Sequence, residues 1–284
     1  MHQLYPIKRL NSWRTGSQVK YYSKPDSREA LCDIYDKYYK ERTIWLGLGS
    51  NILFPDSVLE AHIIHTTAAL REMYMSNEHI YVEAGVSLGK VAKLAAKQGY
   101  VDASFLAGIP GTLGGALKMN AGAYGHEIWQ YVESVDVLTQ TGVETVMPNA
   151  FEIGYRHVIL PKDMVMFLSA KLRFEPHCHE EAKSRIKDYL IRRNRAQPIG
   201  TYNCGSVFTN PDGMSTGRMI DQLGLLGYQI GGARISPKHG NFIENIHGEA
   251  TTKDIWSLIY FMQERIWQHH QVRLKLEVTV YDNI

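Results

Sequence analysis

The chain has 284 residues, 44% of them hydrophobic, which is enough for a sizeable core and for more than one lobe. Its 31 basic and 29 acidic residues give a net charge of +2, which favours no nucleic-acid or membrane-surface partner. Cys32, Cys178 and Cys204 form no CxxC pair, so neither a zinc finger nor a disulfide scaffold is indicated. The N-terminal residues lack the apolar h-region of a signal peptide, and no run approaches the roughly 18 apolar residues of a membrane span. We expect a soluble, cytoplasmic globular protein.

Local patterns predict the following elements in chain order. Ser27 is a suitable cap for a helix in which Leu31, Ile34 and Tyr35 recur at helical spacing. Residues 88–100 predict an amphipathic helix that ends near Gly99. The other predicted elements are strands at 43–46, 62–66 and 79–86, a strand–turn–strand at 132–149 with Thr141-Gly142 at the turn, a strand at 164–176, a charged helix at 177–197, a helix at 252–269 and a final strand at 273–282. This order predicts an α+β chain with a boundary near 175–188.

A glycine-rich segment at residues 107–125 interrupts these elements. Six of its nineteen residues are glycine, and we interpret that density as neither helix nor strand, because glycine costs entropy in both. Its bare backbone suits a flat or phosphorylated ligand. A flexible linker is the simpler alternative, but Ile109, Leu113, Leu117 and Met119 are too apolar for one.

Other motifs give weaker signals. GLGSNI at 47–52 begins like GxGxxG but has Ile52 in place of the third glycine and lies in no clear βαβ unit, so a Rossmann site is not expected. The turn could instead form a nest of N–H groups for a pyrophosphate, or be an ordinary glycine turn. HCHEE at 177–181 has no usual metal-site spacing, so we expect a solvated helix start and no metal. Cys204 has no His–Asp arrangement beside it, so we expect it to pack.

Three polar residues stand in notable settings. Arg156 lies in FEIGYRHVIL, Ser206 in NCGSVFTNP, and Glu277 on the face of the final strand opposite its apolar row. Taken singly, each has a simpler interpretation: a surface arginine, a turn serine and a solvated strand glutamate.

Taken together, these segments resemble the UDP-N-acetylenolpyruvoylglucosamine reductase (MurB) family, within the wider vanillyl-alcohol-oxidase-like flavoproteins. AGIPGTLGGALKMNAGAYG matches the flavin loop of the family almost residue for residue. NSWRTG, GLGSN, GYRHV, the run from an arginine through QP to GSVFTNP, GARISPKHGNFIEN and the terminal LEV follow in family order. The resemblance covers nearly the whole chain and favours the shorter type of the family.

The resemblance implies a two-lobed FAD-binding domain of the vanillyl-alcohol-oxidase/PCMH type at 1–180, with lobes at about 1–75 and 76–180, and an α+β substrate-binding domain at 181–284. FAD would lie between the lobes. NADPH would reduce it and leave, and the enolpyruvyl sugar nucleotide would take the same cleft. The implied FAD-binding residues are Gly47, Gly49, Ser50, Asn51, Gly108, Ile109, Pro110, Gly111, Thr112, Gly115, Asn120, Gly122, Ala123 and Gly125.

The resemblance also implies the chemistry, which is reduction of UDP-N-acetylglucosamine enolpyruvate to UDP-N-acetylmuramate in peptidoglycan precursor synthesis. Separately, we expect the chain to act as a monomer. Arg156 would stabilise the enolate that forms as hydride arrives. Ser206 would give the proton to the new C–H bond, and Glu277 would polarise the substrate carboxylate. The implied substrate-binding residues are Tyr155, Asn210, Lys238 and His239.

Two departures from the family pattern keep other functions in view. Leu48 stands where the turn usually has glycine, and Val158 replaces a common serine beside Arg156. One alternative is a different flavoprotein of the superfamily, such as an alcohol or lactone oxidase, although GSVFTNP and Glu277 argue against it. The other is a flavin- or nucleotide-binding sensor or scaffold without catalysis. The retained Arg156, Ser206 and Glu277 argue against it.

Overall fold

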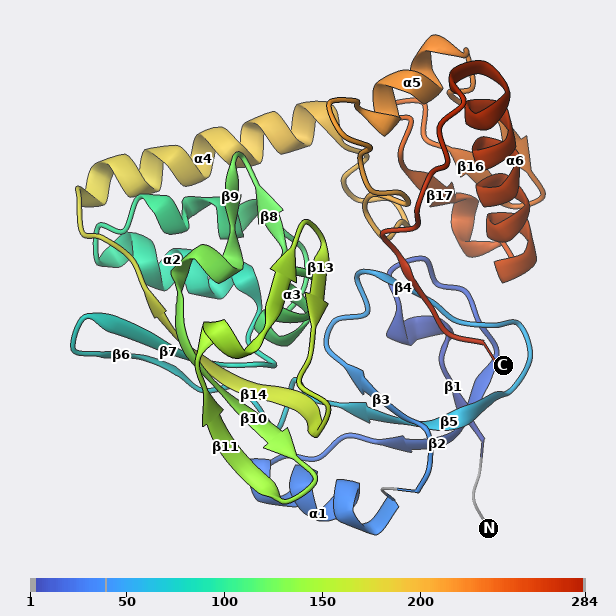
Figure 1. Cartoon of the computed structure of the whole chain (residues 1–284). Helices are drawn as coiled ribbons and strands as arrows, with labels where there is room; N and C mark the ends of the chain where they lie inside the picture. Colours follow the sequence, from blue (N-terminus) through green and yellow to red (C-terminus); the bar gives the residue numbers. More distant parts are fainter. Residues whose placement is uncertain (1–3, 39, 283–284) are drawn as a thin grey trace. The chain divides into compact units, whose positions relative to one another are not determined.

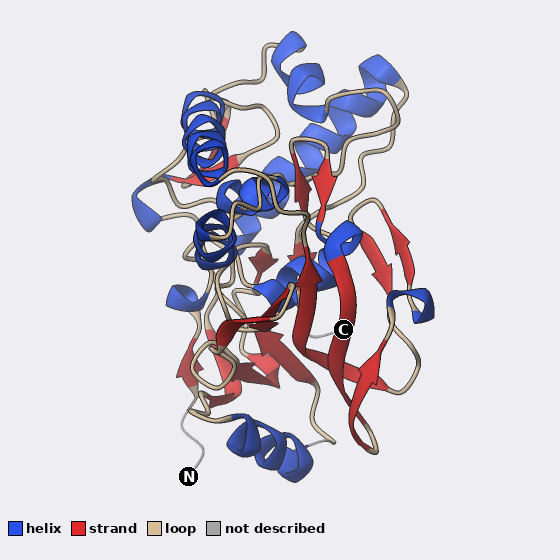
Figure 2. Ribbon diagram, turned by 90° about the vertical axis from the view of Figure 1, so that its left-hand side faces the viewer, coloured by secondary structure: helices blue, strands red, loops and turns tan. Residues whose placement is uncertain are grey.

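A computed structural model describes residues 4–38 and 40–282 of the chain (Figure 1). These residues form two compact units. The terminal unit draws on both ends of the sequence: the residues up to Tyr22, Leu48–Ile63 and the residues from Asn194. The central unit consists of Ser23–Gly47 and Ile64–Arg193. Both units mix helices with strands (Figure 2), so the α+β prediction is confirmed.

The central unit is built on a five-stranded antiparallel sheet in the order β11-β10-β14-β7-β6 (Figure 1). Its strands are β6 (Met73–Ser76), β7 (His79–Glu83), β10 (Val132–Thr139), β11 (Gly142–Val146) and β14 (Met164–Arg173). Val135 and Val137 alternate along β10 and are both buried, so one face of the sheet lies on the core. Thr139 pairs with Gly142 across the turn, which confirms the predicted strand–turn–strand. The turn itself is Gln140-Thr141, one residue earlier than predicted, because Gly142 already belongs to β11.

Helices and short elements complete the central unit. The helices are α1 (Arg28–Tyr38), α2 (Leu88–Lys97), α3 (Leu113–Met119) and most of α4 (His179–Ala196). The hydroxyl of Ser27 accepts the N–H of Ala30 at 3.1 Å, and Gly99 follows α2 with a φ of +77°, so both predicted helix ends are confirmed. The short elements are β3 (Thr43–Leu46), η2 (Asp102–Gly108), β8 (Gly122–Ala123), β9 (His126–Glu127), η3 (Ile128–Tyr131), η4 (Pro148–Ala150), β12 (Glu152–Gly154) and β13 (His157–Ile159).

The interpretation of the glycine-rich segment as neither helix nor strand was wrong for its centre, which is α3, and for Gly122–Ala123, which form the short strand β8. LGGALKM forms α3, because Leu113, Ala116 and Leu117 share one face of the helix and are all buried. Gly114 lets that face approach the sheet, since a Cβ there would lie 3.0 Å from the Cβ of Ala84. Burial of the apolar face therefore outweighs the low helix propensity of glycine.

The terminal unit holds a three-stranded antiparallel sheet, β15-β16-β17, packed against α6. The elements of the terminal unit are β1 (Tyr5–Pro6), η1 (Lys8–Leu10), most of β2 (Gln18–Ser23), β4 (Ile52–Leu53), most of β5 (Leu59–His65), α5 (Thr216–Gln222), β15 (Gln229–Ile230), β16 (Ala233–Ile235), β17 (Ile243–Asn245), η5 (Ile246–Gly248), α6 (Thr252–His270) and β18 (Thr279–Val280). Thr251 and Asp254 form a capping box at the start of α6. Ile255, Leu258 and Ile259 bury its inner face.

The final strand is much shorter than predicted. Only β18 is a strand, and it pairs in parallel with β4. Upstream of it, the extended chain makes a single bridge between Leu276 and Phe208. The carbonyl of Val207 accepts the N–H groups of both Glu277 (2.8 Å) and Val278 (3.4 Å), and this sharing interrupts a regular ladder. The segment still aligns Glu277 with the residues that follow Ser206.

Among the described helices, none is long and apolar enough to cross a membrane.

Candidate active site

Arg156 lies at the tip of a tight hairpin in the central unit. Gly154 and His157 pair at the ends of β12 and β13, so Tyr155 and Arg156 form the two-residue loop. Arg156 has a left-handed backbone, with a φ of +55°. Its half-buried guanidinium donates to the carbonyl oxygens of Asn120 (3.2 Å) and Gly122 (2.7 Å). The structure therefore joins the predicted enolate-stabilising arginine to the glycine-rich segment.

The side chain of Asn120 forms a second link between the glycine-rich segment and the hairpin of Arg156. It is 1% exposed, and its Nδ2 donates to the carboxylate of Glu127 (2.8 Å) and the carbonyl of Gly154 (3.0 Å). Its Oδ1 accepts the N–H of Trp129 at 3.4 Å. The side chain and the backbone of Asn120 are therefore both used within the protein, and its contact with FAD stays a prediction.

The glycine-rich segment presents the bare backbone that a flat cofactor requires. A Cβ added at Gly115 or Gly125 would meet nothing within 4 Å, and both residues are exposed. At Gly47, by contrast, a Cβ would lie 2.4 Å from Oγ1 of Thr112, so these two predicted FAD residues pack directly together. Open space above backbone, without side chains that fill it, fits the flavin predicted here.

The GLGSN turn is set by close backbone packing at Gly49, a residue of the terminal unit. This glycine has a φ of +63°, and its carbonyl accepts the N–H of Ser12 at 2.9 Å. A Cβ there would lie only 2.0 Å from the carbonyl oxygen of Leu10. The turn therefore requires glycine for structural reasons, whatever it binds. Leu48, the departure from the family pattern, is exposed and leaves this packing undisturbed.

We expect Gly49→Ala to lower the free energy of unfolding by about 2–5 kcal/mol, from roughly 1–2 for the left-handed backbone and 1–3 for overpacking. Gly213 is the matched control, because its φ is +70° but a Cβ there would meet nothing within 4 Å. Gly213→Ala should lower the free energy of unfolding only by the roughly 1–2 kcal/mol of the left-handed backbone. Urea denaturation of both variants measures the difference, and equal losses would contradict the packing argument.

Ser206 and Glu277 lie on adjacent extended segments of the terminal unit. Both residues are half-buried, and the N–H of Glu277 donates to the carbonyl of Val207 at 2.8 Å. Asn51 also reaches this strand, because its Nδ2 donates to the carbonyl of Glu277 at 3.0 Å. The structure thus brings the serine, the glutamate and the end of the GLGSN turn together. Arg156 belongs to the other unit, and its action in the same cleft stays a prediction.

Cys204, two residues before Ser206, is a packing residue as predicted. It is 4% exposed, and its Sγ donates to the carbonyl of Ile52 at 3.4 Å. Burial raises the pKa of its thiol to about 12. At neutral pH it is therefore a neutral thiol, and not an activated nucleophile.

This protonation state predicts selective alkylation. At about pH 8, roughly one Cys204 thiol in 10⁴ would be ionised, and the group is buried as well. We expect iodoacetamide to modify the exposed Cys178 but to leave Cys204 unmodified in the folded protein. Peptide mass spectrometry reads both sites, and a urea-denatured sample in which both react is the control. Rapid modification of Cys204 in the native protein would contradict its assignment.

The predicted substrate-binding residues make different contacts. The ring of Tyr155 is exposed and lies 5.0 Å from Cζ of Arg156. Oδ1 of Asn210 accepts the N–H of Thr216, the first residue of α5, at 3.1 Å. Nζ of Lys238 donates to the carbonyl of Asn194. Their role toward a substrate stays a prediction.

His239, the fourth predicted substrate residue, is held within its own loop. Its Nδ1 accepts the N–H of Asn241 at 3.2 Å, so the proton of the neutral ring sits on Nε2. Burial lowers the pKa of this imidazole, which favours the neutral form. The ring also covers Gly217, where a Cβ would lie 2.8 Å from its Cε1. His239 can therefore offer a substrate an N–H donor and no charge near neutral pH.

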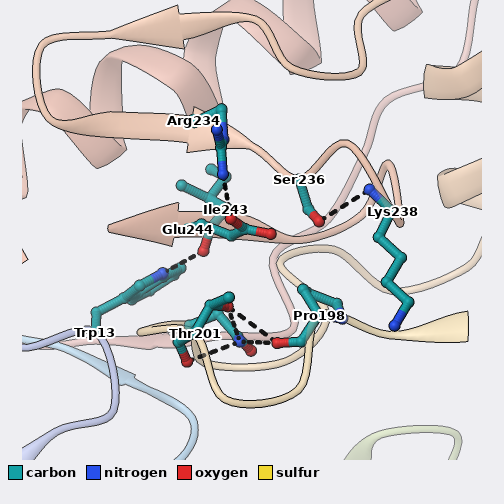
Figure 3. Close-up of polar contacts among 9 residues, drawn as sticks. Trp13, Pro198, Thr201, Arg234, Ser236, Lys238, Ile243 and Glu244 are labelled. Atoms are coloured by element: carbon teal, nitrogen blue, oxygen red, sulfur yellow. Dashed lines mark hydrogen bonds and ion pairs between the residues drawn. The ribbon is translucent and has the colours of Figure 1, made fainter. Parts of the chain in front are cut away.

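Two polar features of the terminal unit escaped the sequence analysis. Arg234 on β16 and Glu244 on β17 form an ion pair at 2.8 Å (Figure 3), although Glu244 is only 5% exposed. Asn241, in the loop between these strands, is 3% exposed, and its Oδ1 accepts the N–H of Phe208, two residues after Ser206. All three residues stand in the GARISPKHGNFIEN motif, but no periodicity marks such contacts. Within the described part of the chain, no group of three His, Cys, Asp or Glu side chains is placed to hold a metal.

Comparison with known proteins completes the assignment. A family model described as UDP-N-acetylenolpyruvoylglucosamine reductase, C-terminal domain, matches residues 197–281, and one described as FAD binding domain matches residues 19–146. The reductase of that name from Legionella pneumophila (strain Paris) is 41% identical over 278 residues, covering 97% of this chain and 91% of its own. The reductase from Alkalilimnicola ehrlichii is 39% identical over 277 residues, covering 97% of this chain and 92% of its own.

A solved structure agrees with these relatives. The crystal structure of the reductase from Thermus caldophilus superimposes with a TM-score of 0.85 at 30% identity. The match covers 99% of this chain and 98% of that one, so both units have counterparts in one known protein. The resemblance found in the sequence is confirmed, together with the combination of an FAD-binding domain and a family-specific C-terminal domain. On this identity and coverage, the chain belongs to the UDP-N-acetylenolpyruvoylglucosamine reductase family.

Proposed function

We propose that this chain is the NADPH-dependent reductase that converts UDP-N-acetylglucosamine enolpyruvate to UDP-N-acetylmuramate through bound FAD. The observation that carries the proposal is the similarity to named reductases over 97% of the chain. The enzyme is an oxidoreductase of peptidoglycan precursor synthesis. We further propose that it works as a monomer in the cytoplasm and thereby serves cell wall biogenesis, cell shape and cell division.

The residues of the central unit fit the cofactor. The open backbone at Gly115 and Gly125 suits the flat flavin ring, and the matched FAD binding domain supports the same ligand. When bound, FAD carries hydride between NADPH and the enolpyruvyl group. The protein contributes placement and electrostatics. We propose that the other FAD contacts come from the GLGSN turn and the rest of residues 107–125.

Arg156 would act on the charge that develops during reduction. Hydride addition to the terminal carbon of the enolpyruvyl group leaves negative charge on the adjacent carbon and its carboxylate. A guanidinium placed beside that carboxylate stabilises the charge most strongly where water is scarce. The carbonyls of Asn120 and Gly122 orient the guanidinium without cancelling its charge. This support would hold Arg156 ready before the substrate enters.

Ser206 and Glu277 would complete the reaction. The new C–H bond needs a proton, and the Ser206 hydroxyl would donate it to the carbon that carries the negative charge. A hydroxyl is a weak acid, but a carbon so basic can take its proton when the two atoms are held in reach. Glu277, in its protonated form, would donate a hydrogen bond to the substrate carboxylate. The contact between Glu277 and Val207 supports this division of roles, because it fixes the two segments together.

An anaerobic flavin titration tests the proposal. We expect NADPH to bleach the absorption of the bound flavin, and the enolpyruvyl sugar nucleotide to restore it without oxygen. Replacing NADPH by NADH in a parallel run measures the preference between the two donors. Rapid oxygen consumption with a simple alcohol, and none of these changes with the sugar nucleotide, would favour the oxidase alternative. A flavin that NADPH does not bleach would favour a binding protein without catalysis.

A further inference from the structure

The two residues that follow Ser206 are held by one buried asparagine. Asn241 lies in the loop between β16 and β17 and is 3% exposed. Its main-chain carbonyl accepts the N–H of Val207 at 2.9 Å. Its side-chain Oδ1 accepts the N–H of Phe208 (3.0 Å), and its Nδ2 donates to the carbonyl of Phe208 (2.7 Å). Three hydrogen bonds thus run from one residue to the chain immediately after the predicted proton donor.

The loop that carries Asn241 is itself fixed by short-range contacts. The N–H of Ser236 donates to the carbonyl of Phe242 at 2.8 Å, and the N–H of Phe242 donates to the carbonyl of His239 at 3.1 Å. The N–H of Lys238 donates to Oγ of Ser236 at 3.2 Å (Figure 3), and that of Asn241 donates to Nδ1 of His239 at 3.2 Å. Asn241 is therefore placed by its own loop and can act as a rigid support.

On its opposite edge, the Val207–Phe208 segment contacts the extended chain that holds Glu277, the other predicted catalytic residue of the terminal unit. The carbonyl of Val207 accepts the N–H of Glu277 at 2.8 Å, and Phe208 bridges Leu276. The N–H of Val207 and both main-chain polar groups of Phe208 are therefore bound to Asn241, whereas the carbonyl of Val207 is bound to the extended segment of Glu277. Loss of the Asn241 side chain would therefore remove two of the hydrogen bonds that hold Phe208 on the side away from Glu277.

We propose that Asn241 is a positioning residue for proton donation by Ser206, an inference that rests on the proposed function. Removal of its side chain would leave the N–H and carbonyl of Phe208 without those partners, although Phe208 is fully buried. The segment would shift to recover hydrogen bonds. Proton donation needs the hydroxyl within about 3 Å of its acceptor, and a misplacement of about 1 Å can cost roughly 10²-fold in rate.

The test compares two asparagines of the terminal unit that are equally buried. Asn245 is also 3% exposed, and it also holds backbone: its Nδ2 donates to the carbonyl of Trp13 (2.7 Å) and its Oδ1 accepts the N–H of Ala250 (2.8 Å). Neither of these partners adjoins Ser206. Asn245→Ala therefore matches Asn241→Ala in residue type, burial and lost hydrogen bonds, but leaves the Ser206 segment alone.

Anaerobic stopped-flow measurement of the two half-reactions separates positioning from general damage. In Asn241→Ala we expect reoxidation of the flavin by the sugar nucleotide to slow by roughly 10- to 10²-fold, with reduction by NADPH changed less than about twofold. In Asn245→Ala both rates should stay within about twofold of the wild type. Unchanged reoxidation in Asn241→Ala, or equal slowing of both half-reactions, would overturn the inference. A wild-type flavin that the sugar nucleotide does not reoxidise would instead contradict the proposed function.

Amide hydrogen exchange gives a readout that does not depend on activity. We expect Asn241→Ala, in purified protein, to lose protection at the Phe208 amide by a larger factor than Asn245→Ala does, because the substitution removes the acceptor of that N–H and keeps the main-chain acceptor of Val207. Equal protection of the Phe208 amide in both variants would overturn the inference as well. If Asn241→Ala does not fold, Asn241→Asp keeps an acceptor for the Phe208 N–H and replaces the donor by a carboxyl oxygen that faces the Phe208 carbonyl. Its expected result is a slowing of reoxidation in the same direction.

Discussion

Replacement of Ser206 by alanine is expected to slow reoxidation of the reduced flavin by the enolpyruvyl sugar nucleotide by about 10²–10⁴-fold, the usual contribution of a positioned general acid. Reduction of the flavin by NADPH requires no proton from this hydroxyl and should proceed at the wild-type rate. Single-turnover stopped-flow absorbance under anaerobic conditions measures both steps. The expected split arises because the substitution removes one oxygen atom from a half-buried position and leaves the backbone contacts of Val207 in place.

Ser215 provides the matched control for this substitution. It lies in the same unit, and its Oγ accepts the N–H of Arg218 at 3.4 Å as the cap of α5. Ser215→Ala should lower stability by about 1 kcal/mol, as the loss of a helix cap does, and should leave both half-reactions unchanged. If Ser206→Ala reoxidised its flavin at the wild-type rate, Ser206 would not be the proton donor.

Replacement of Arg156 by glutamine is expected to have the second large effect. Loss of the positive charge should slow flavin reoxidation by the sugar nucleotide about 10²–10³-fold, because the enolate loses its electrostatic stabilisation. The substitution also removes the donors to the carbonyls of Asn120 and Gly122, so FAD should bind more weakly. Arg156→Lys keeps the charge but lacks the planar, two-pronged donor, so we expect partial recovery of the rate. Stopped-flow rates and flavin fluorescence measure the two consequences separately.

An exposed arginine of the central unit serves as the control. Arg173 pairs with Glu78 at 3.2 Å on the surface, a contact that is worth little. Arg173→Gln should change neither the reoxidation rate nor FAD affinity. If Arg156→Gln weakened FAD binding but reoxidised at the wild-type rate once saturated with FAD, the role of Arg156 would be confined to the support of residues 107–125.

The sequence predicted most elements because their signals are local. The Ser27 cap, the hairpin turn after Thr139 and the long apolar face of α6 each depend on residues within a few positions of one another. All three appear in the structure, with the turn at Gln140-Thr141, one residue earlier than predicted. The family motifs likewise named Arg156 and Ser206 from short runs of letters. Such information is contained in the chain before it folds.

Two predictions failed where packing overrode local preference. Glycine density argued against any helix in residues 107–125, but α3 forms because its leucine and alanine face is buried against the sheet. Alternation of apolar residues argued for a long final strand, but only β18 finds a regular partner. Propensity and period describe what a segment prefers alone, and tertiary contacts decided both cases.

By itself the sequence determined the fold class, the family and the chemical types of the proposed catalytic residues. Only the tertiary structure decided how those residues are held. Arg156 is supported by carbonyls more than thirty residues away, and Asn51 reaches Glu277 across 226 positions. Asn241, in the loop between β16 and β17, likewise accepts the N–H of Phe208, which lies in a different part of the sequence. Hydrogen bonds between a side chain and distant backbone follow no period and no spacing, because they exist only after the chain has folded and brought the two groups together.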